Sequence, residues 1–245
     1  SCENVEFKET HISWVLLTDN YAFKIKRPVK YSFLDFSTLE KREHYCHEEI
    51  RLNKRIEPDM YLKVLPVKQN LGIDNKDTND KTVDYAVQMK RMDNSKKMDV
   101  LLRENKIDEK HMESVARKIS DFHKEAQVVK NAFRTQEFHE KFADIEKQNN
   151  YIAEHLGEEN KYKIKDCVRK SFDFLNASRN FSNDRVINGF HRDCHGDLNA
   201  RNVFLYEDHP VIFDCIEFNR EFRNIDVLND IAFLCVDLDF FEKQQ

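Results

Sequence analysis

The chain has little glycine and no glycine-rich loop. Only four of its 245 residues are glycine, at positions 72, 157, 189 and 196. Glycine-rich loops let backbone amides approach a phosphate group closely, because glycine has no side chain and adopts backbone angles that other residues avoid. A phosphate-binding loop in this chain would therefore have to be a polar loop that carries side chains.

The chain also lacks a long apolar run and a surplus of basic residues. No apolar run approaches the roughly 20 residues that a membrane-spanning helix needs, and Ser1–Glu6 lacks the apolar core of a secretory signal. The formal net charge is −5, whereas proteins that bind a nucleic-acid backbone usually carry a basic surplus. We therefore expect a cytoplasmic protein with no membrane and no nucleic acid as its main partner.

The cysteines do not have the spacing of a zinc finger. Scattered cysteines in a chain of this size are typical of reduced thiols in a cytosolic protein, and free cysteine is among the residues most often buried. We expect most of these thiols to be buried. They are Cys2, Cys46, Cys167, Cys194, Cys215 and Cys235.

The first ninety residues predict a small sheet interrupted by one helix. Two runs rich in β-branched and aromatic residues, 11–17 and 21–26, flank a polar turn and predict a hairpin. Two further strands are predicted at 62–67 and 83–89, with a polar hairpin loop at 70–81 between them. This region is expected to form a β-rich lobe.

One helix is predicted between these pairs of strands, from Ser37 to about Ile56. Ser37 and Glu40 have the spacing of a capping box, which favours a helix start. Because Glu49 falls on a face with apolar residues, we expect it to point inward, whereas Glu48 lies on the opposite, charged face. The residues on the inward face are Tyr45, Glu49, Leu52 and Ile56.

From residue 93 the pattern becomes mainly helical, so we expect a small lobe over residues 1–90 and a larger, helical lobe over 91–245. Much of the surface of the last predicted helix is apolar, and a continuation of the natural protein past residue 245 would cover it. The expected elements are helices within 112–122, 138–152 and 164–175, a hairpin of 203–206 with 211–213, and a last helix at 225–241.

Two candidate catalytic acids lie close together, Asp193 and Asp197. Kinase-type phosphotransferases place an asparagine five residues after the catalytic aspartate, so that one loop presents a proton acceptor and a metal ligand. The residue five after Asp193 is Leu198, whereas the residue five after Asp197 is Asn202. The spacing therefore favours Asp197 as a base, and Asn202 with Asp214, one hairpin later, as oxygen ligands for magnesium.

Two sets of motifs indicate a family. The C-terminal set is His195–Val203, Val211–Phe218 and Asp230–Ala232, and the N-terminal set is His11–Val15, Lys24–Pro28 and Phe33–Glu40. The C-terminal set resembles the aminoglycoside phosphotransferase family, which shares the protein-kinase-like fold and includes choline, homoserine and fructosamine kinases. The N-terminal set looks like a bacterial branch in which this domain is often fused to a C-terminal P-loop ATPase domain.

The resemblance implies an α+β, bilobal protein-kinase-like fold that uses ATP and Mg²⁺ to phosphorylate a hydroxyl of a small molecule. It implies that Asp197 is the catalytic base, that Asn202 and Asp214 bind magnesium, and that Asp230 braces the catalytic loop. One departure from the family pattern is Asn199, which stands where the family usually has histidine. The acceptor substrate cannot be identified from these motifs.

The resemblance also places the nucleotide. Lys24, favoured over Lys26, would hold the phosphates, and Glu49 would hold Lys24 through an ion pair. In place of a glycine-rich loop, the backbone amides of the loop Thr10–Ser13 and the Ser13 side chain would cap phosphate oxygens. The adenine would meet backbone groups of Gln88, Met89 and Lys90, just before the interlobe hinge.

Three questions stay open at the level of sequence. The chain could instead be a nucleotide-binding regulatory module that acts on a fused or partner P-loop ATPase, although the complete set of Asp197, Asn202 and Asp214 argues against an inactive module. Phosphoryl transfer onto protein ranks last, because Asp214 lacks the Asp-Phe-Gly context. A group of acidic residues could be a solvated surface or could attract a cationic substrate: Asp193, Glu217, Glu221 and Asp226.

Overall fold

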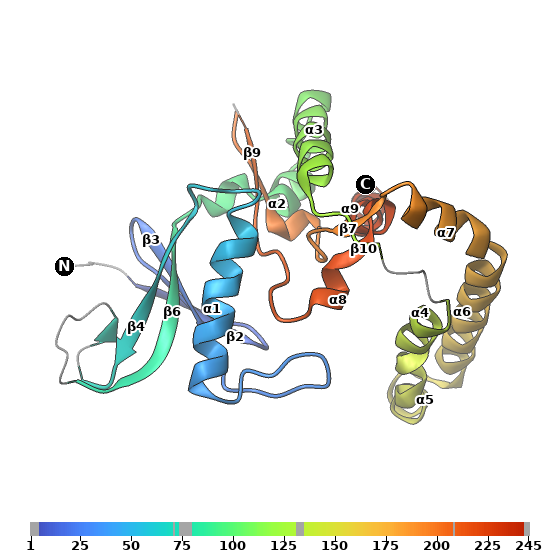
Figure 1. Cartoon of the computed structure of the whole chain (residues 1–245), viewed down its shortest axis with the longest axis horizontal. Helices are drawn as coiled ribbons and strands as arrows, with labels where there is room; N and C mark the ends of the chain where they lie inside the picture. Colours follow the sequence, from blue (N-terminus) through green and yellow to red (C-terminus); the bar gives the residue numbers. More distant parts are fainter. Residues whose placement is uncertain (1–4, 71, 74–79, 131–134, 208, 243–245) are drawn as a thin grey trace. The chain divides into compact units, whose positions relative to one another are not determined.

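The computed structural model describes residues 5–70, 72–73, 80–130, 135–207 and 209–242, and it is of the α+β class. The chain forms two compact units (Figure 1). The first comprises residues 1–127 and 192–245, and the second comprises residues 128–191. The expected lobe boundary at residue 90 lies inside the first unit, and that lobe division stays a prediction.

The N-terminal part of the first unit is an antiparallel sheet of six strands in the order β1-β2-β3-β6-β4-β5. The four predicted strands are confirmed as β2, β3, β4 and β6, and the sequence pattern missed β1 and β5. Residues 71 and 74–79 of the predicted hairpin loop lie outside the described residues. The strands are β1 (Glu6–Glu9), β2 (Ser13–Leu17), β3 (Tyr21–Lys26), β4 (Tyr61–Lys68), β5 (Gly72–Ile73) and β6 (Thr82–Lys90).

Helix α1 (Leu39–Asn53) follows β3 and packs across β4 and β6 (Figure 1). Two residues of the predicted inward face, Glu49 and Leu52, are completely buried, whereas Tyr45 is half-buried and Ile56 lies beyond the end of the helix. The helix begins later than predicted: the Thr38 side chain accepts the capping hydrogen bond from the amide of Lys41, while the Ser37 hydroxyl is bound to Asp35. A serine already engaged by its own upstream neighbour cannot cap the helix.

The rest of the first unit supplies short strands and helices that share one apolar core. Met98, Leu198, Val203, Ile212 and Leu234 are among its buried residues. The predicted hairpin is confirmed as β8 with β9, and the last helix starts later than predicted because residues 224–226 form a strand. The elements are α2 (Met98–Arg103), α3 (Glu109–Glu125), β7 (His191–Asp193), β8 (Val203–Leu205), β9 (Pro210–Ile212), α8 (Arg220–Arg223), β10 (Asn224–Asp226) and α9 (Val227–Glu242), with 3₁₀ turns η1 (Asn94–Lys96) and η3 (Ala200–Asn202).

The second unit is helical, and α6 packs against both α4 and α5. The helix predicted within 138–152 is broken by a 3₁₀ turn, and helical structure continues past Asn183 to Ile187, which the sequence pattern did not predict. The elements are α4 (Thr135–Ala143), η2 (Asp144–Gln148), α5 (Asn149–Leu156), α6 (Glu158–Ala177) and α7 (Arg179–Ile187).

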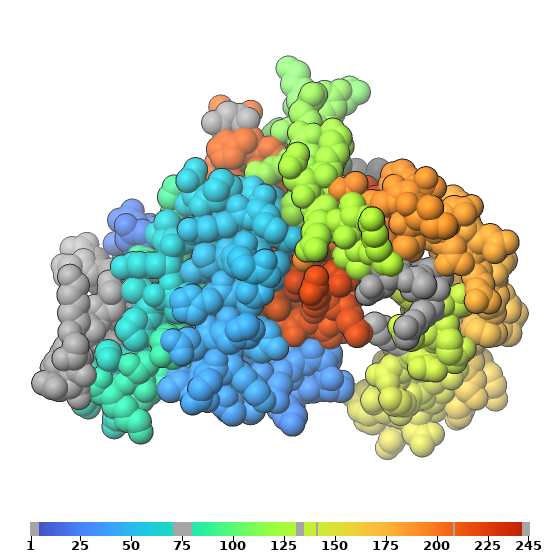
Figure 2. Space-filling view, in the orientation of Figure 1, coloured from blue at the N-terminus to red at the C-terminus, as the bar shows by residue number. Residues whose placement is uncertain are grey.

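The surface of the first unit carries α3 as a projecting ridge (Figure 2). Among the cysteines, Cys46, Cys194 and Cys215 are buried as predicted, whereas Cys167 and Cys235 are exposed, and Cys2 lies outside the described residues. None of the helices in the described part of the chain combines the length and the apolar character needed to cross a membrane.

Candidate active site

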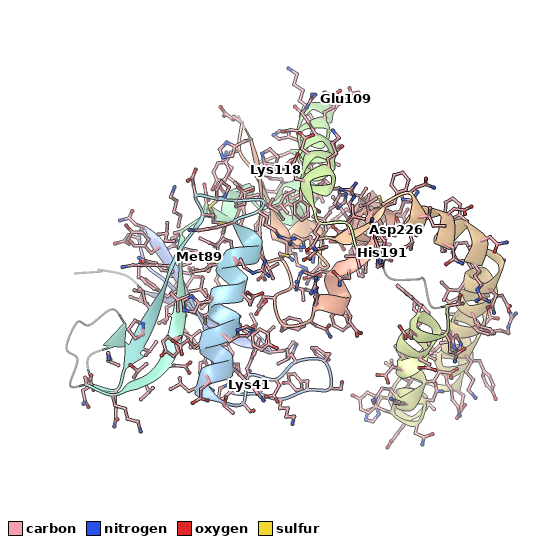
Figure 3. All side chains as sticks on the ribbon, in the orientation of Figure 1. Lys41, Met89, Glu109, Lys118, His191 and Asp226 are labelled. Atoms are coloured by element: carbon pink, nitrogen blue, oxygen red, sulfur yellow. The ribbon has the colours of Figure 1, made fainter. Side chains whose placement is uncertain are left out.

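A cavity of about 670 Å³ in the first unit gathers most of the predicted site residues. One wall is apolar and is formed by side chains from β2, β3, β6 and β8 and from the segment after β6, among them Leu17, Ala22, Met89, Met92 and Phe204. Figure 3 shows Met89 on β6, beside α1. Charged side chains also line the cavity, among them Lys24, Asp197 and Asp214.

Lys24 lies between two carboxylates. Its Nζ donates to Glu49 Oε1 at 2.9 Å and to Asp214 Oδ1 at 2.6 Å. Burial alone would lower the pKa of Lys24, but Asp214 and Glu49 outweigh this effect and raise its pKa well above the ordinary value. The Lys24 side chain, on β3, is therefore positively charged. It is paired with Glu49 of α1, as predicted, and it also contacts Asp214 in the loop after β9.

Lys26 lies on the same face of β3 as Lys24, because residues two apart in a strand point to the same side. Its Nζ donates to Glu49 Oε2 at 2.7 Å and also forms an ion pair with Glu217. Lys26 and Glu49 are completely buried. Both lysines are therefore paired with Glu49, but of the two only Lys24 lines the cavity.

Asp197 and Asn202 face each other across one turn of loop. The Asn202 Nδ2 donates to Asp197 Oδ2 at 3.1 Å and to the backbone oxygen of Asp197 at 2.9 Å, while Asn199 Nδ2 donates to Asp197 Oδ1 at 2.9 Å. Burial raises the pKa of Asp197 above the ordinary aspartate value, although both amides act against it. Because the Asn202 nitrogen is occupied, its amide oxygen is the atom left for a ligand.

Asp214 has a backbone conformation that only a few residue types adopt readily. Its φ is +66°, in the left-handed region that aspartate tolerates better than most residues. Its amide donates to the Tyr61 hydroxyl at 3.1 Å, and its side chain is 39% exposed. Strained backbone of this kind is often found at functional sites, and here it turns a carboxylate into the cavity. Amide and carboxylate oxygens are the ligands that magnesium prefers, so Asn202 and Asp214 fit that ion.

A buried histidine and a buried aspartate hold the loop that carries Asp197. His195 accepts from the Asp197 amide at Nδ1, and its Nε2 lies 2.9 Å from the backbone oxygen of Phe213, so it ties this loop to the segment before Asp214. Asp230 accepts from the amides of His195 and Gly196 and contacts His123 Nε2 at 2.9 Å. Burial alone would raise the pKa of Asp230, but these hydrogen bonds lower it below the ordinary value.

The backbone conformation and the surroundings of residue 196 both favour glycine. Its φ is +86°, and a Cβ at this position would lie 2.8 Å from the backbone oxygen of Phe222. We expect Gly196→Ala to lower the free energy of unfolding by about 2 kcal/mol or more, because both backbone strain and the clash must be relieved. Gly157→Ala is the matched control: its φ is +93°, but no atom lies within 4 Å of the added Cβ. Equal losses in denaturant unfolding for the two variants would contradict a role for the clash.

Two predicted nucleotide contacts are not presented to the cavity. Ser13 is buried, its amide donates to Thr10 Oγ1 at 2.9 Å, and its hydroxyl has no hydrogen-bond partner among the described residues. Thr10 and the two residues after it line the cavity instead. Gln88 does not line it either, whereas Met89 and Lys90 do.

The backbone of residues 88–90 has partners within the sheet. Strand β6 lies between β3 and β4, and the Lys90 amide donates to the Met60 oxygen at 2.9 Å. These backbone groups therefore face neighbouring strands, because an interior strand is paired along both edges. Just after β6, the Arg91 amide donates to the Asn20 oxygen at 2.9 Å and the Asp93 amide donates to the Tyr206 hydroxyl at 3.1 Å.

Two of the four acidic residues that were expected to be either solvated or substrate-binding, Asp193 and Glu217, instead form buried ion pairs. Asp193 and Glu217 are buried. Asp193 accepts from Arg223 Nε at 2.9 Å, and Glu217 is paired with Lys26. The sequence did contain an indication of the Lys26–Glu217 pair. Lys26 lies on the same strand face as Lys24, and Glu217 follows Asp214 by only three residues.

Comparison with known proteins gives distant relatives. No family model matches the chain. Proteins of Mycobacterium bovis and Mycobacterium tuberculosis, described as uncharacterized, are 28% identical to it over 244 residues. The match covers 98% of this chain and 47% of each relative, so the chain spans about half the length of the curated relatives it matches.

Proposed function

We propose that the chain is an ATP- and magnesium-dependent phosphotransferase of protein-kinase-like fold, which moves the γ-phosphate to a hydroxyl of a small molecule. The observation that carries this proposal is the meeting of the Lys24–Glu49 ion pair with Asp197, Asn202 and Asp214 around one cavity. In such enzymes a lysine on the third strand pairs with a glutamate of the following helix, a loop carries an aspartate with asparagine five residues on, and a later aspartate binds magnesium. Strand β3, helix α1 and the two loops supply the same residue types here.

The charge around the cavity supports an anionic ligand. The chain as a whole is acidic, with a net charge of −5, yet five basic and three acidic side chains line the cavity. Concentrated positive charge in a concave site attracts a triphosphate. The basic residues are Lys8, Lys24, Lys90, Lys97 and Arg201, and the acidic ones are Asp197, Asp214 and Glu217.

The apolar wall supports a flat base beside the phosphates. Met60, Met89 and Met92 lie on it, and methionine adapts its shape to planar groups. In this arrangement the base would lie against β3 and β6, and the phosphates would extend toward Lys24. Met89, Lys90 and Met92 line the cavity, so the proposed adenine contact lies at the end of β6 and just after it.

Each charged residue has a separate task in this proposal. Asp197 takes the proton of the acceptor hydroxyl as the new bond to phosphorus forms. Lys24 has three N–H donors, of which Glu49 and Asp214 take two, so the third serves a phosphate oxygen. Magnesium bound by Asn202 and Asp214 would supply neutralising charge at the phosphates.

The first experiment measures ADP release from Mg·ATP by the purified chain, with and without each of a panel of acceptors. The panel contains aminoglycosides, choline, homoserine, fructosamines and simple sugars, which all offer a hydroxyl. We expect release that depends on one class of acceptor and disappears when magnesium is removed with EDTA. Failure to bind Mg·ATP at all would reject the proposal.

A second candidate is a regulatory module that binds Mg·ATP and controls another domain. The observation that favours it is that more than half of each mycobacterial relative lies outside the matched region, which leaves room for a P-loop ATPase domain or another partner. The two functions share nucleotide binding, so only turnover separates them. Mg·ATP binding without acceptor-dependent ADP release from any compound would favour the regulatory module.

A further inference from the structure

A second buried ion pair lies directly behind the proposed phosphate site. Lys26 Nζ contacts both Glu49 Oε2 and Glu217, while Lys24 Nζ contacts Glu49 Oε1 and Asp214. The network therefore contains two positive and three negative groups in one chain of contacts. Glu49 is its centre, with one carboxylate oxygen for each lysine.

The two lysines compete for Glu49. Lys24 has Asp214 as its other partner, and Lys26 has Glu217. A lysine that loses its other carboxylate must draw more strongly on Glu49, because a buried charge without a partner is very unfavourable. The strength with which Glu49 holds Lys24 therefore depends on how well Glu217 satisfies Lys26.

The geometry assigns Lys26 and Glu217 as positioning residues, which set how tightly Glu49 holds Lys24. That Lys24 binds phosphate in this position rests on the proposed function. Three observations support this role over simple burial of charge. Lys26 contacts the same carboxylate that holds Lys24. Glu217 lines the cavity itself, and it lies three residues after Asp214, the other partner of Lys24.

The network also joins distant parts of the first unit. Glu49 belongs to α1, the lysines belong to β3, and Glu217 belongs to the loop after β9. Asn53, one turn after Glu49, accepts from the Cys215 amide at 2.9 Å, between Asp214 and Glu217. Movement of α1 away from Lys24 would therefore have to break the Lys26 contact and this hydrogen bond as well.

The test measures how fast Lys24 reacts with acetic anhydride, followed by mass spectrometry of its peptide, in the full chain without nucleotide. The amine reacts only when it leaves its carboxylate partners, so the rate reports how tightly they hold it. Glu217→Gln leaves Lys26 with Glu49 alone, which draws Glu49 away from Lys24. Lys26→Met gives Glu49 to Lys24 alone.

We expect Lys24 to react about threefold faster in Glu217→Gln and about threefold slower in Lys26→Met, because each variant changes how Glu49 is shared and leaves both carboxylate partners of Lys24 in place. The opposite signs matter, since a merely structural role would loosen the site in both variants. Glu48→Gln is the matched control, one residue from Glu49 on α1, where the carboxylate pairs with exposed Arg51; it should leave the rate unchanged.

Equal rates in wild type and Glu217→Gln, with Tm preserved, would overturn the assignment, and so would faster reaction in both variants. If Lys26→Met does not fold, an unchanged Lys24 rate in Glu217→Gln relative to Glu48→Gln still overturns the assignment. The affinity for Mg·AMP-PNP is measured separately on the same proteins. Absence of binding in wild type would reject the proposed function, but the labelling rates would still decide whether Lys26 and Glu217 position Lys24.

Discussion

Asp197→Asn is expected to lower acceptor-dependent ADP release by about 10²- to 10⁴-fold, the usual contribution of a general base. Asparagine keeps the size of the side chain and one oxygen that can accept from Asn199 or Asn202, but it cannot take a proton from the acceptor. The affinity for Mg·ATP should change only a few-fold, since Lys24, Asn202 and Asp214 remain. Initial rates and calorimetric titration of the same preparation check both statements.

The control for this prediction is Asp121→Asn, on the exposed face of α3, where the carboxylate pairs with Lys124. It should leave the rate of ADP release unchanged. An Asp197→Asn variant that retains most of the wild-type rate, with a normal Tm, would show that Asp197 is not the base. Because burial raises the pKa of Asp197, the acid limb of the wild-type rate should lie at higher pH than for an ordinary aspartate.

Glu49→Gln is expected to lower the free energy of unfolding by about 3–5 kcal/mol, the cost of removing one partner from a buried ion pair. The carboxylate is completely buried and serves both Lys24 and Lys26. A neutral amide removes one of the two carboxylate partners of each buried ammonium group and leaves Lys24 with Asp214 and Lys26 with Glu217. Urea unfolding at neutral pH measures the loss, and Glu48→Gln, which removes an exposed pair with Arg51, should cost about 1 kcal/mol or less.

The same residue should shape the acid stability of the chain. Burial alone would raise the pKa of Glu49, but Lys24 and Lys26 outweigh it and lower the pKa from 4.5 to about 2. A pKa that is lower in the folded chain stabilises it above the unfolded value and ceases to do so as the group is protonated. The contribution of Glu49 to the free energy of unfolding should therefore be complete above pH 4.5 and disappear as the pH falls toward 2. The free energy of unfolding of Glu49→Gln should decrease less steeply with falling pH over that range.

Local patterns were sufficient for the elements that carry the site. The alternation in 21–26 predicted β3, and the spacing of Glu49 with Leu52 predicted the buried face of α1. Likewise, the five-residue spacing from Asp197 predicted that Asn202 lies on the same loop, and the structure joins the two side chains by a hydrogen bond of 3.1 Å. The structure brings Lys24, Glu49, Asp197, Asn202 and Asp214 to one cavity or its edge, as the sequence predicted.

The sequence pattern did not show which side chains and backbone groups are already paired with one another in the fold. Ser13 was expected to face phosphates, but its amide is taken by Thr10. Gln88 was expected near the adenine, but β6 is paired on both edges. Glu217 was expected to be either a solvated acid or a contact for a cationic substrate, but the fold buries it against Lys26, which lies 191 residues earlier in the chain.

The sequence by itself determined which residue types are present in which strand, helix or loop, because periodicity, capping residues and short spacings act over a few bonds. Only the tertiary structure decided which carboxylate pairs with which lysine. Lys24 and Lys26 have the same local signal on β3, yet one faces the cavity and the other is sealed behind it. Their difference depends on where α1 and the loop after β9 place Glu49, Asp214 and Glu217, and the energy of a buried charge is decided by such partners.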